Sequence, residues 1–378
     1  MIDSNTMVGT GTGIKLSCSQ EALAQKLAIV SRAVSSRASV QILSGVLLRA
    51  EGGRLHLAAT DMELSLRSSM DAQIDAEGAV VVPGRLLVDL VRLLPEHEVT
   101  IEQRVEESVV HVTSGPSITA LNTYAAEDFP RLPDLDAVGT FTVDREVLLD
   151  TVNRVARSAS RDESRPVLTG ILVRFEGGSL VMAATDSYRL SVKETPLTGE
   201  APEFEAIIPA RALAELSRIA QSGDTVELGI HENQVVFAAD DVWLTTRRID
   251  GQFPNYKQLL PESFEHEVAL PRAELLDVVR RVGVLVQRTS PIQLRFADGE
   301  LRVLARTQDV GQAQETLPVP FSGAPLEIGF NAEFLREGIE SIAADEVRMR
   351  LISPLRPAVI DGGPDDPTYL IMPIRLPG

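Results

Sequence analysis

Residues 58–64 read Ala-Ala-Thr-Asp-Met-Glu-Leu, and this stretch returns twice along the chain. The second copy, Ala-Ala-Thr-Asp-Ser-Tyr-Arg-Leu at 183–190, begins 125 positions later (183 minus 58). A weaker copy, Leu-Ala-Arg-Thr-Gln-Asp at 304–309, places its threonine 122 positions further on (307 minus 185). A period this long has the size of a whole domain, whereas solenoid repeats span only about 20 to 50 residues. The sequence therefore predicts three tandem copies of one fold.

The same elements recur in the same order in each copy. Leucine and valine at three- and four-residue spacing predict two helices per copy, at 20–34 and 83–92, 144–156 and 209–218, and 271–282 and 331–340. Alternating strand patterns lie at 55–59, 180–184 and 301–305. Paired strands close each copy, at 99–102 with 109–112, 226–228 with 235–237, and 347–351 with 358–360. We predict an α+β fold in which the helices cover one face of antiparallel sheet.

Pro-rich linkers at 129–133 and 253–261 mark the junctions between copies. The expected organisation is a flexible N-terminal tail at 1–13 and three domains, at 14–136, 137–262 and 263–378.

The composition is that of an ordinary globular protein, with 44% hydrophobic and 24% charged residues. No apolar run approaches the length of a membrane span, and the first 13 residues lack the regions of a signal peptide. A single cysteine, Cys18, excludes an intramolecular disulfide and fits a reducing compartment. A cytoplasmic location is expected.

The formal net charge of -18 argues against ordinary nucleic-acid binding, which neutralises phosphates with lysine and arginine. A DNA-binding role would need basic residues gathered on one face of an acidic body. Arg85 and Arg92 are seven positions apart and so share a helix face. Arg211 and Arg218 stand at the equivalent places, 126 positions later (211 minus 85). Because the pair recurs, we expect a molecule whose basic residues lie on one face and whose acidic residues lie elsewhere.

Catalytic and metal-binding patterns are missing from the sequence. The five histidines never stand at metal-ligand spacing, so neither a metal nor another cofactor is expected. Asp61 and Asp186 could be imagined as an acid/base pair, but they are equivalent residues of two copies. A repeated Thr-Asp at a strand end is more typical of a turn or cap, and the chain is predicted not to be an enzyme.

Three features carry a resemblance to a known family: the triplication, Asp-Gly-Gln-Phe-Pro-Asn-Tyr at 250–256, and Met-Pro-Ile-Arg-Leu at 372–376. With the segment at 184–190, they make the chain resemble the bacterial DNA polymerase III beta subunit, the DNA sliding clamp, from about residue 14 to residue 376. The resemblance implies a head-to-tail homodimeric ring around duplex DNA, with helices lining the hole and sheets outside. A closed ring is held on DNA by topology, so weak, sequence-independent phosphate contacts suffice despite the negative charge.

Arginines on the predicted helices, and one in the loop after the first helix, are the candidates to face DNA: Arg32, Arg37, Arg85, Arg92, Arg154, Arg157, Arg211, Arg218, Arg280 and Arg281. In the resembled family, the replicative polymerase, the clamp loader and repair polymerases dock a short linear motif between the second and third domains. Carried over by position, that pocket comprises Leu168, Thr185, Tyr188, Arg189, Leu190, Pro254, Leu259, Leu355, Leu370, Met372, Pro373 and Arg375. The resemblance also implies a dimer interface that includes Leu121, Val284 and Leu285.

Some positions depart from the pattern of the family or of the copies. Ser187 and Tyr188 stand where Gly-His is common, and Gln258 stands where a basic residue often lies. Glu333 and Glu340 replace the paired arginines in the third copy. These two glutamates keep open an alternative, a three-domain protein-interaction scaffold that does not encircle DNA.

Overall fold

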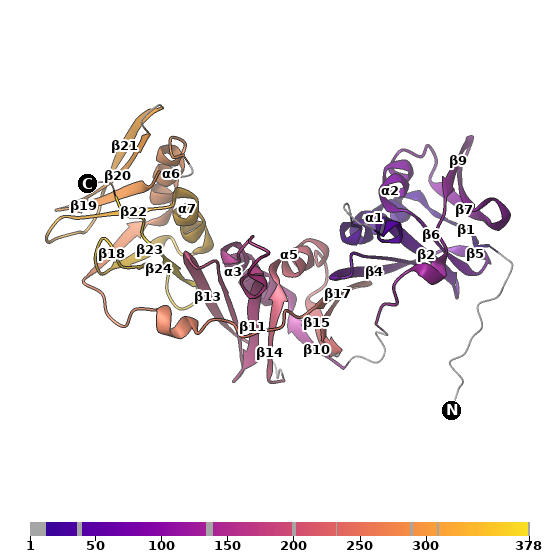
Figure 1. Cartoon of the computed structure of the whole chain (residues 1–378), viewed down its shortest axis with the longest axis horizontal. Helices are drawn as coiled ribbons and strands as arrows, with labels where there is room; N and C mark the ends of the chain where they lie inside the picture. Colours follow the sequence, from indigo (N-terminus) through magenta and orange to yellow (C-terminus); the bar gives the residue numbers. More distant parts are fainter. Residues whose placement is uncertain are drawn as a thin grey trace. The chain divides into compact units, whose positions relative to one another are not determined.

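The computed structural model describes residues 13–35, 40–133, 139–198, 202–231, 233–287, 290–307 and 310–376. Its contacts divide the chain into two compact units, coloured along the sequence in Figure 1. Unit 1 comprises Met1–Arg145 and Arg218–Arg247, and unit 2 comprises Glu146–Ser217 and Arg248–Gly378. Each unit therefore holds one predicted copy and part of the second.

All six predicted helices are confirmed. They are α1 (Gln20–Val30), α2 (Gly84–Arg92), α3 (Arg145–Val155), α5 (Ala210–Ile219), α6 (Arg272–Gly283) and α7 (Ala332–Ser341). Side-chain caps fix two of the starts, because Ser19 Oγ accepts a hydrogen bond from Ala22 N and Asn331 Oδ1 accepts one from Phe334 N. The short helix α4 (Pro166–Thr169) was not predicted. Among the described residues, no helix combines the length and apolar content that a membrane span requires.

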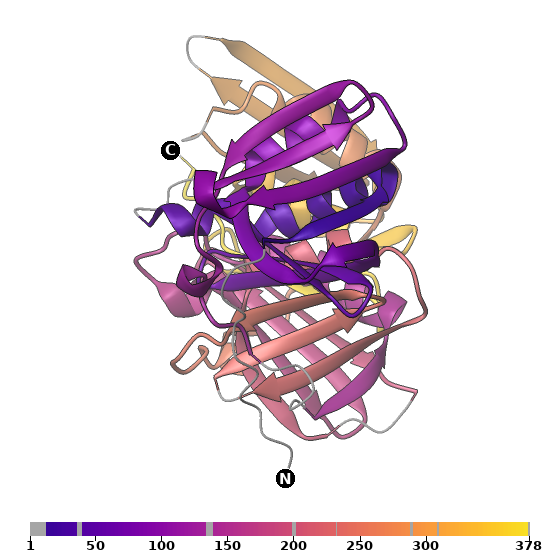
Figure 2. The same cartoon turned by 90° about the vertical axis from the view of Figure 1, so that its right-hand side faces the viewer.

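Unit 1 contains two antiparallel sheets, with the strand orders β5-β1-β7-β8-β9 and β10-β15-β16-β17-β4-β3-β2-β6. The strands of the first are β1 (Lys15–Ser19), β5 (Gln73–Ala76), β7 (Glu98–Arg104), β8 (Val109–Ser114) and β9 (Ser117–Asn122). Those of the second are β2 (Gly45–Glu51), β3 (Arg54–Thr60), β4 (Leu64–Asp71), β6 (Gly78–Pro83), β10 (Thr140–Asp144), β15 (Thr225–His231), β16 (Gln234–Ala239) and β17 (Val242–Arg247). Figure 2 looks onto unit 1, where α1 packs on α2 and on β3 and β4.

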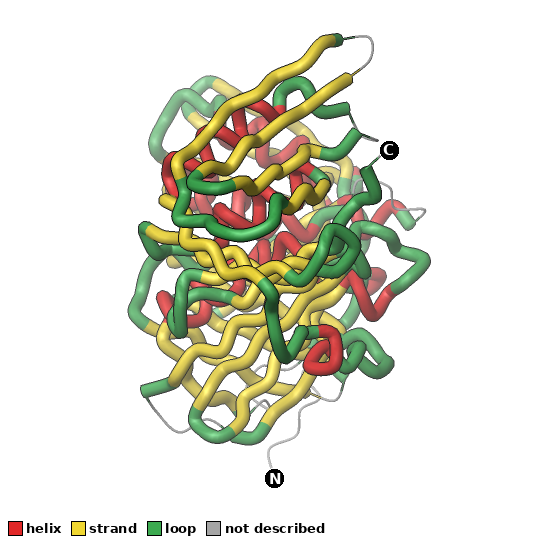
Figure 3. The backbone as a smooth tube through the Cα atoms, turned by 90° about the vertical axis from the view of Figure 1, so that its left-hand side faces the viewer, coloured by secondary structure: helices red, strands yellow, loops and turns green. Residues whose placement is uncertain are grey.

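Unit 2 has the same kind of construction, with the strand orders β14-β11-β12-β13-β25-β24-β23-β18 and β21-β20-β19-β22. The first sheet contains β11 (Gly170–Glu176), β12 (Ser179–Thr185), β13 (Arg189–Pro196), β14 (Phe204–Pro209), β18 (His266–Pro271), β23 (Glu346–Leu351), β24 (Ala358–Asp361) and β25 (Thr368–Ile371). The second contains β19 (Ile292–Ala297), β20 (Glu300–Thr307), β21 (Gly311–Pro318) and β22 (Leu326–Phe330). In the upper part of Figure 3, which is coloured by secondary structure, strands (yellow) lie in front of helices (red).

The predicted strand pairs are confirmed, and two further pairings explain why the units do not follow the predicted domain boundaries. β17 pairs with β4 and β13 pairs with β25, so each eight-stranded sheet joins strands from two copies. Backbone hydrogen bonds thus join a strand that precedes each Pro-rich linker to a strand that follows it. The boundaries at 136/137 and 262/263 stay a sequence-based proposal.

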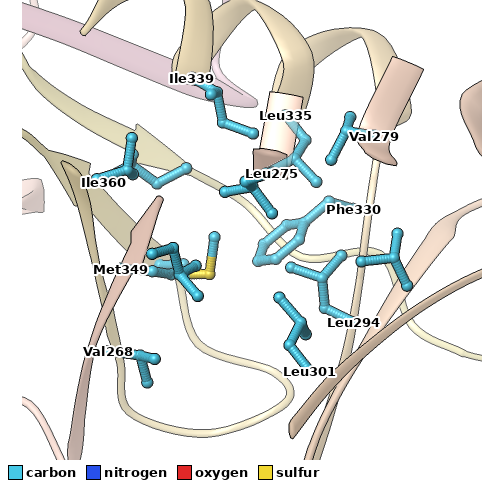
Figure 4. Close-up of a cluster of buried hydrophobic side chains, with 14 of the residues drawn as sticks. Val268, Leu275, Val279, Leu294, Leu301, Phe330, Leu335, Ile339, Met349 and Ile360 are labelled. Carbon is cyan, nitrogen blue, oxygen red and sulfur yellow. The ribbon is translucent and has the colours of Figure 1, made fainter. Parts of the chain in front are cut away.

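One large apolar core of unit 2 lies between α6, α7 and the strands around them (Figure 4). Leu275 and Val279 come from α6, Leu335 and Ile339 from α7, and Phe330 from the end of β22, and all are almost completely buried. Burying one such side chain contributes about 1.5–3 kcal/mol. Leu335 and Ile339 thus hold α7 against the sheets of unit 2.

Candidate functional site

The repeated Thr-Asp motif forms a tight turn at the end of β3 in unit 1. Thr60 Oγ1 accepts a hydrogen bond from Met62 N at 3.0 Å and lies 3.2 Å from the Leu64 carbonyl, to which it donates. Asp61 Oδ1 accepts from Glu63 N at 3.1 Å and from Leu64 N at 2.8 Å. Met62 has a φ of 77°, in the left-handed region that favours glycine.

The motif in unit 2 forms the same turn between β12 and β13. Thr185 Oγ1 accepts from Ser187 N at 3.2 Å and donates to the Arg189 carbonyl at 2.6 Å. Asp186 Oδ1 accepts from Tyr188 N at 2.9 Å and from Arg189 N at 3.0 Å. Ser187 has a φ of 80°. The prediction of a turn is confirmed, because both carboxylates are occupied with backbone N–H groups.

This second turn meets the C-terminal segment of the chain. Met372 N donates to the Tyr188 carbonyl at 2.8 Å, continuing the β13–β25 ladder in which Leu190 lies opposite Leu370. Further along, Ile374 N donates to the Gly329 carbonyl at 2.8 Å and anchors the segment to β22. Strand pairing therefore brings Tyr188 and Met372 side by side, although 184 positions separate them (372 minus 188).

A buried apolar cluster forms the floor beneath this meeting point. It contains Leu172, Ala183, Leu190, Ile207, Tyr256, Val359 and Leu370, with Val167, Val192, Ile249, Phe253, Leu260 and Phe264 packed against it. Three predicted pocket residues are neighbours in sequence of cluster members: Leu168 in α4, Pro254 before the 3-10 turn η7 (Tyr256–Leu259), and Leu259 within it.

Four of the predicted pocket residues are large apolar side chains that are nevertheless exposed. The exposed fractions are 62% for Tyr188, 50% for Leu259, 59% for Leu355 and 41% for Met372. We call these four residues the apolar patch. Thr185, Leu190 and Leu370 are buried, Pro373 is half-buried, and Pro254 and Arg375 are exposed. Strand pairing places two of the four, Tyr188 and Met372, side by side, and exposed apolar side chains of this size are typical of a surface that binds a partner.

Arg189 does not belong to the accessible surface, although it was predicted to line the pocket. Its guanidinium is buried, pairs with Asp186 at 3.1 Å and with Glu337 of α7, and lies 4.2 Å from the centre of the Phe334 ring. Burial by itself would lower the pKa of Arg189, but Tyr369 and Glu337 outweigh it and the pKa is raised. As placed, Arg189 holds the turn against α7 instead of facing a ligand.

A cavity of about 530 Å³ lies beside the linker, between residues 248–257 and strands β11 and β14. Of the predicted pocket residues, only Pro254 lines it. Its walls carry Arg174 and Glu205, whose side chains pair at 2.6 Å. This cavity is therefore different from the apolar patch.

The paired arginines predicted to face DNA occupy matched helix positions. Because α2 begins at residue 84 and α5 at residue 210, Arg85 and Arg211 are second and Arg92 and Arg218 are ninth in their helices. All four side chains are exposed, and so is Arg32. Arg37 lies outside the described residues.

The remaining predicted arginines are bound to carboxylates. Arg154 is mostly buried and donates to Asp150 at 2.7 Å and to Asp366 at 2.8 Å, so its placement is that of a structural link and not of a DNA-facing residue. Arg157 and Arg280 share one glutamate of α7, and Arg281 pairs with Glu315 of β21 at 2.7 Å. Asp150 stands only four positions before Arg154, but the other acidic partners, Asp366, Glu340 and Glu315, lie at least 34 positions away in the chain, so no local pattern revealed those pairs.

Family models match almost the whole chain. The N-terminal domain of the DNA polymerase III beta subunit matches residues 14–133, the central domain 142–255 and the C-terminal domain 257–375. The chain belongs to the DNA polymerase III beta subunit family, the beta sliding clamps. It is 36% identical over 375 residues to the beta sliding clamp of Synechococcus elongatus, with 96% of this chain and 100% of that protein covered. With the beta sliding clamp of Streptomyces coelicolor the identity is 35% over 380 residues, with 97% and 100% covered.

Solved sliding clamps share the fold. The Caulobacter crescentus clamp, described with polyethylene glycol bound to a putative beta-motif tethering region, has a TM-score of 0.91 at 30% identity over 97% of this chain and 100% of its own. The Pseudomonas aeruginosa clamp bound to griselimycin has a TM-score of 0.88 at 28% identity over 96% and 100%. These relatives support a DNA sliding clamp and do not favour the scaffold alternative. Within the described residues, no cluster of His, Cys, Asp or Glu could hold a metal ion.

The interface residues implied by the clamp resemblance differ in exposure. Val284, directly after α6, is 80% exposed, whereas Leu121 in β9 and Leu285 are half-buried. Ile118 of β9 is also an exposed apolar residue, and sequence reasoning missed it. The signal that could have found it is the period of two along 117–122, which puts Ile118 and Ala120 on one face of an edge strand and Leu121 on the other.

Proposed function

We propose that this sliding clamp is a non-catalytic cytoplasmic ring, formed by two chains head to tail, that encircles duplex DNA and tethers replication and repair proteins to it. The observation that carries the proposal is the exposure of arginines at the second and ninth positions of two equivalent helices. Regularly placed arginines bind phosphates without reading sequence, as a sliding contact requires.

Two strands that lie at the ends of their sheets, as far as the described residues go, support closure of the ring. β9 ends the five-stranded sheet of unit 1, and β21 ends the four-stranded sheet of unit 2. An open edge presents unpaired N–H and C=O groups to any other strand. Pairing of β9 in one protomer with β21 in its partner would cover both edges and bury the exposed Ile118 and Val284 in a heterologous contact that closes.

The apolar patch supports the tethering role. Short linear motifs with bulky apolar anchors bind surfaces whose apolar side chains are exposed before the partner arrives. Relatives described with griselimycin or with polyethylene glycol bound at a putative tethering region are consistent with a ligand site in this family. The replicative polymerase, the clamp loader and repair polymerases are the proposed partners at this patch.

The DNA contact is tested by replacing Arg85, Arg92, Arg211 and Arg218 together with glutamine. Each lost phosphate contact should reduce the slope of log K against log salt concentration by about 0.9, so the four-arginine variant should bind duplex DNA more weakly and with a shallower slope. Fluorescence anisotropy of labelled duplex DNA at several salt concentrations measures both quantities. Replacing Arg54 and Arg302, which pair with acidic neighbours on strands, is the control and should leave the slope unchanged. An unchanged slope in the four-arginine variant would contradict the assignment.

A further inference from the structure

Glu340 of α7 binds two arginines that were expected to face DNA. Its Oε2 lies 2.5 Å from Arg157 Nη1, and its Oε1 lies 2.9 Å from Arg280 Nη2. The two arginines come from different elements, the 3-10 turn η6 (Ala156–Ser158) after α3 and the last turn of α6. Each carboxylate oxygen thus takes one guanidinium.

The exposures within this group are unequal. The glutamate side chain is 18% exposed, whereas the side chains of Arg157 and Arg280 are 54% and 52% exposed. Burial alone would raise the pKa of Glu340, but hydrogen bonds from Arg280 and Arg157 outweigh it and keep the pKa below its usual range. The carboxylate is therefore ionised at neutral pH, beneath two arginines that remain open to solvent.

The position of Glu340 in its helix can be compared with the equivalent helices of the other two copies. Because α7 begins at residue 332, Glu340 is the ninth residue of the helix, the place that Arg92 and Arg218 hold in the equivalent helices. Two copies therefore carry an arginine at this place, and the third carries an anion that pairs with Arg157 of the second copy and Arg280 of its own.

We propose that Glu340 stands in for a DNA phosphate and withholds Arg157 of the second copy and Arg280 of the third copy from the duplex, so that this part of the chain grips DNA less tightly than α2 and α5 do. This inference rests on the proposed function. A carboxylate and a phosphate each offer two oxygens to a pair of guanidinium groups, so the two anions compete for the same donors. Weak contact along part of the inner surface favours sliding, because each phosphate bound adds to the barrier between successive positions.

The test is Glu340→Gln in the full-length protein, with labelled linear duplex DNA as the probe. Loss of the charge frees two arginines, so the slope of log K against log salt should steepen by up to about 1.8, or about 0.9 for each new phosphate contact. Affinity at low salt should rise about tenfold. Adding Arg157→Gln and Arg280→Gln to the same variant should cancel the gain.

Glu333→Gln is the matched control. Glu333 lies two turns earlier on the same helix, is exposed, and makes no ion pair among the described residues, so this change removes the same charge without freeing an arginine. It should raise affinity slightly and leave the slope as it was. Equal steepening in both variants would assign the effect to net charge and overturn the inference.

Two further outcomes separate this inference from the proposed function. A Glu340→Gln protein with a lower melting temperature and an unchanged slope would show that the carboxylate only links helices, and would overturn the inference alone. If the four-arginine variant also binds DNA like the wild type, the proposed DNA contact fails and the inference fails with it.

Discussion

The two Thr-Asp turns have the same pattern of hydrogen bonds but present different side chains at the surface. In unit 1, Arg247 N donates to the Glu63 carbonyl at 3.2 Å, and in unit 2, Met372 N donates to the Tyr188 carbonyl at 2.8 Å. All four side chains are exposed. We call these two contacts the first and the second junction. The first junction presents a glutamate and an arginine at the positions where the second presents a tyrosine and a methionine. The same fold is used twice, and at these two equivalent positions the side chains are charged in unit 1 and apolar in unit 2.

The next residue of each turn is a second difference between the two junctions. Leu64 is buried opposite Thr246 of β17, whereas Arg189 is buried opposite Ile371 of β25. The leucine needs only apolar neighbours, but the arginine needs Glu337, which α7 supplies. The second junction is thus tied to a helix by charge, in addition to the strand pairing that both junctions have.

The largest expected effect comes from giving the second junction the side chains of the first. Tyr188→Glu with Met372→Arg should abolish binding of a fluorescent Gln-Leu-x-Leu-Phe peptide, because each lost apolar anchor is worth about 1.5–3 kcal/mol, or roughly 10- to 100-fold in affinity. Fluorescence polarisation measures the dissociation constant. Glu63→Gln with Arg247→Gln is the control at the other junction and should bind the peptide like the wild type. Retained binding in the first variant would remove the apolar patch from the proposed site.

A smaller effect is expected on stability when Arg189 is replaced by leucine, the residue of the first turn. The change leaves Glu337, whose side chain is only 11% exposed, without its arginine and should lower the free energy of unfolding by about 3–5 kcal/mol. Urea unfolding followed by circular dichroism measures the loss. Adding Glu337→Leu removes the orphaned charge and should recover part of it. A neutral Arg189→Leu variant would mean that strand pairing alone holds the second junction.

The sequence predicted the parts of this comparison that depend on local pattern. Helical periodicity placed α2, α5 and α7, and the Thr-Asp repeat predicted the two turns, because each signal lies within a few residues. The Arg189–Glu337 pair spans 148 positions, so no local pattern could reveal it. The same holds for Glu340, which sequence reasoning noted as a departure without seeing the two arginines that it binds. Helix α4 is a single turn and too short for a periodic signal.

The smallest expected effect concerns the residue with a positive φ that stands at the same position in each turn. Met62 and Ser187 have φ values of 77° and 80°, which cost a non-glycine residue about 1 kcal/mol. Met62→Gly should therefore raise the free energy of unfolding by up to about 1 kcal/mol. Ser187→Gly should raise it less, because Ser187 Oγ accepts a hydrogen bond from Arg165 Nη1 at 3.1 Å that glycine cannot accept. Urea unfolding of the two variants side by side measures the difference. A larger gain at Ser187 than at Met62 would show that the two turns, although they share their backbone hydrogen bonds, do not store the same strain.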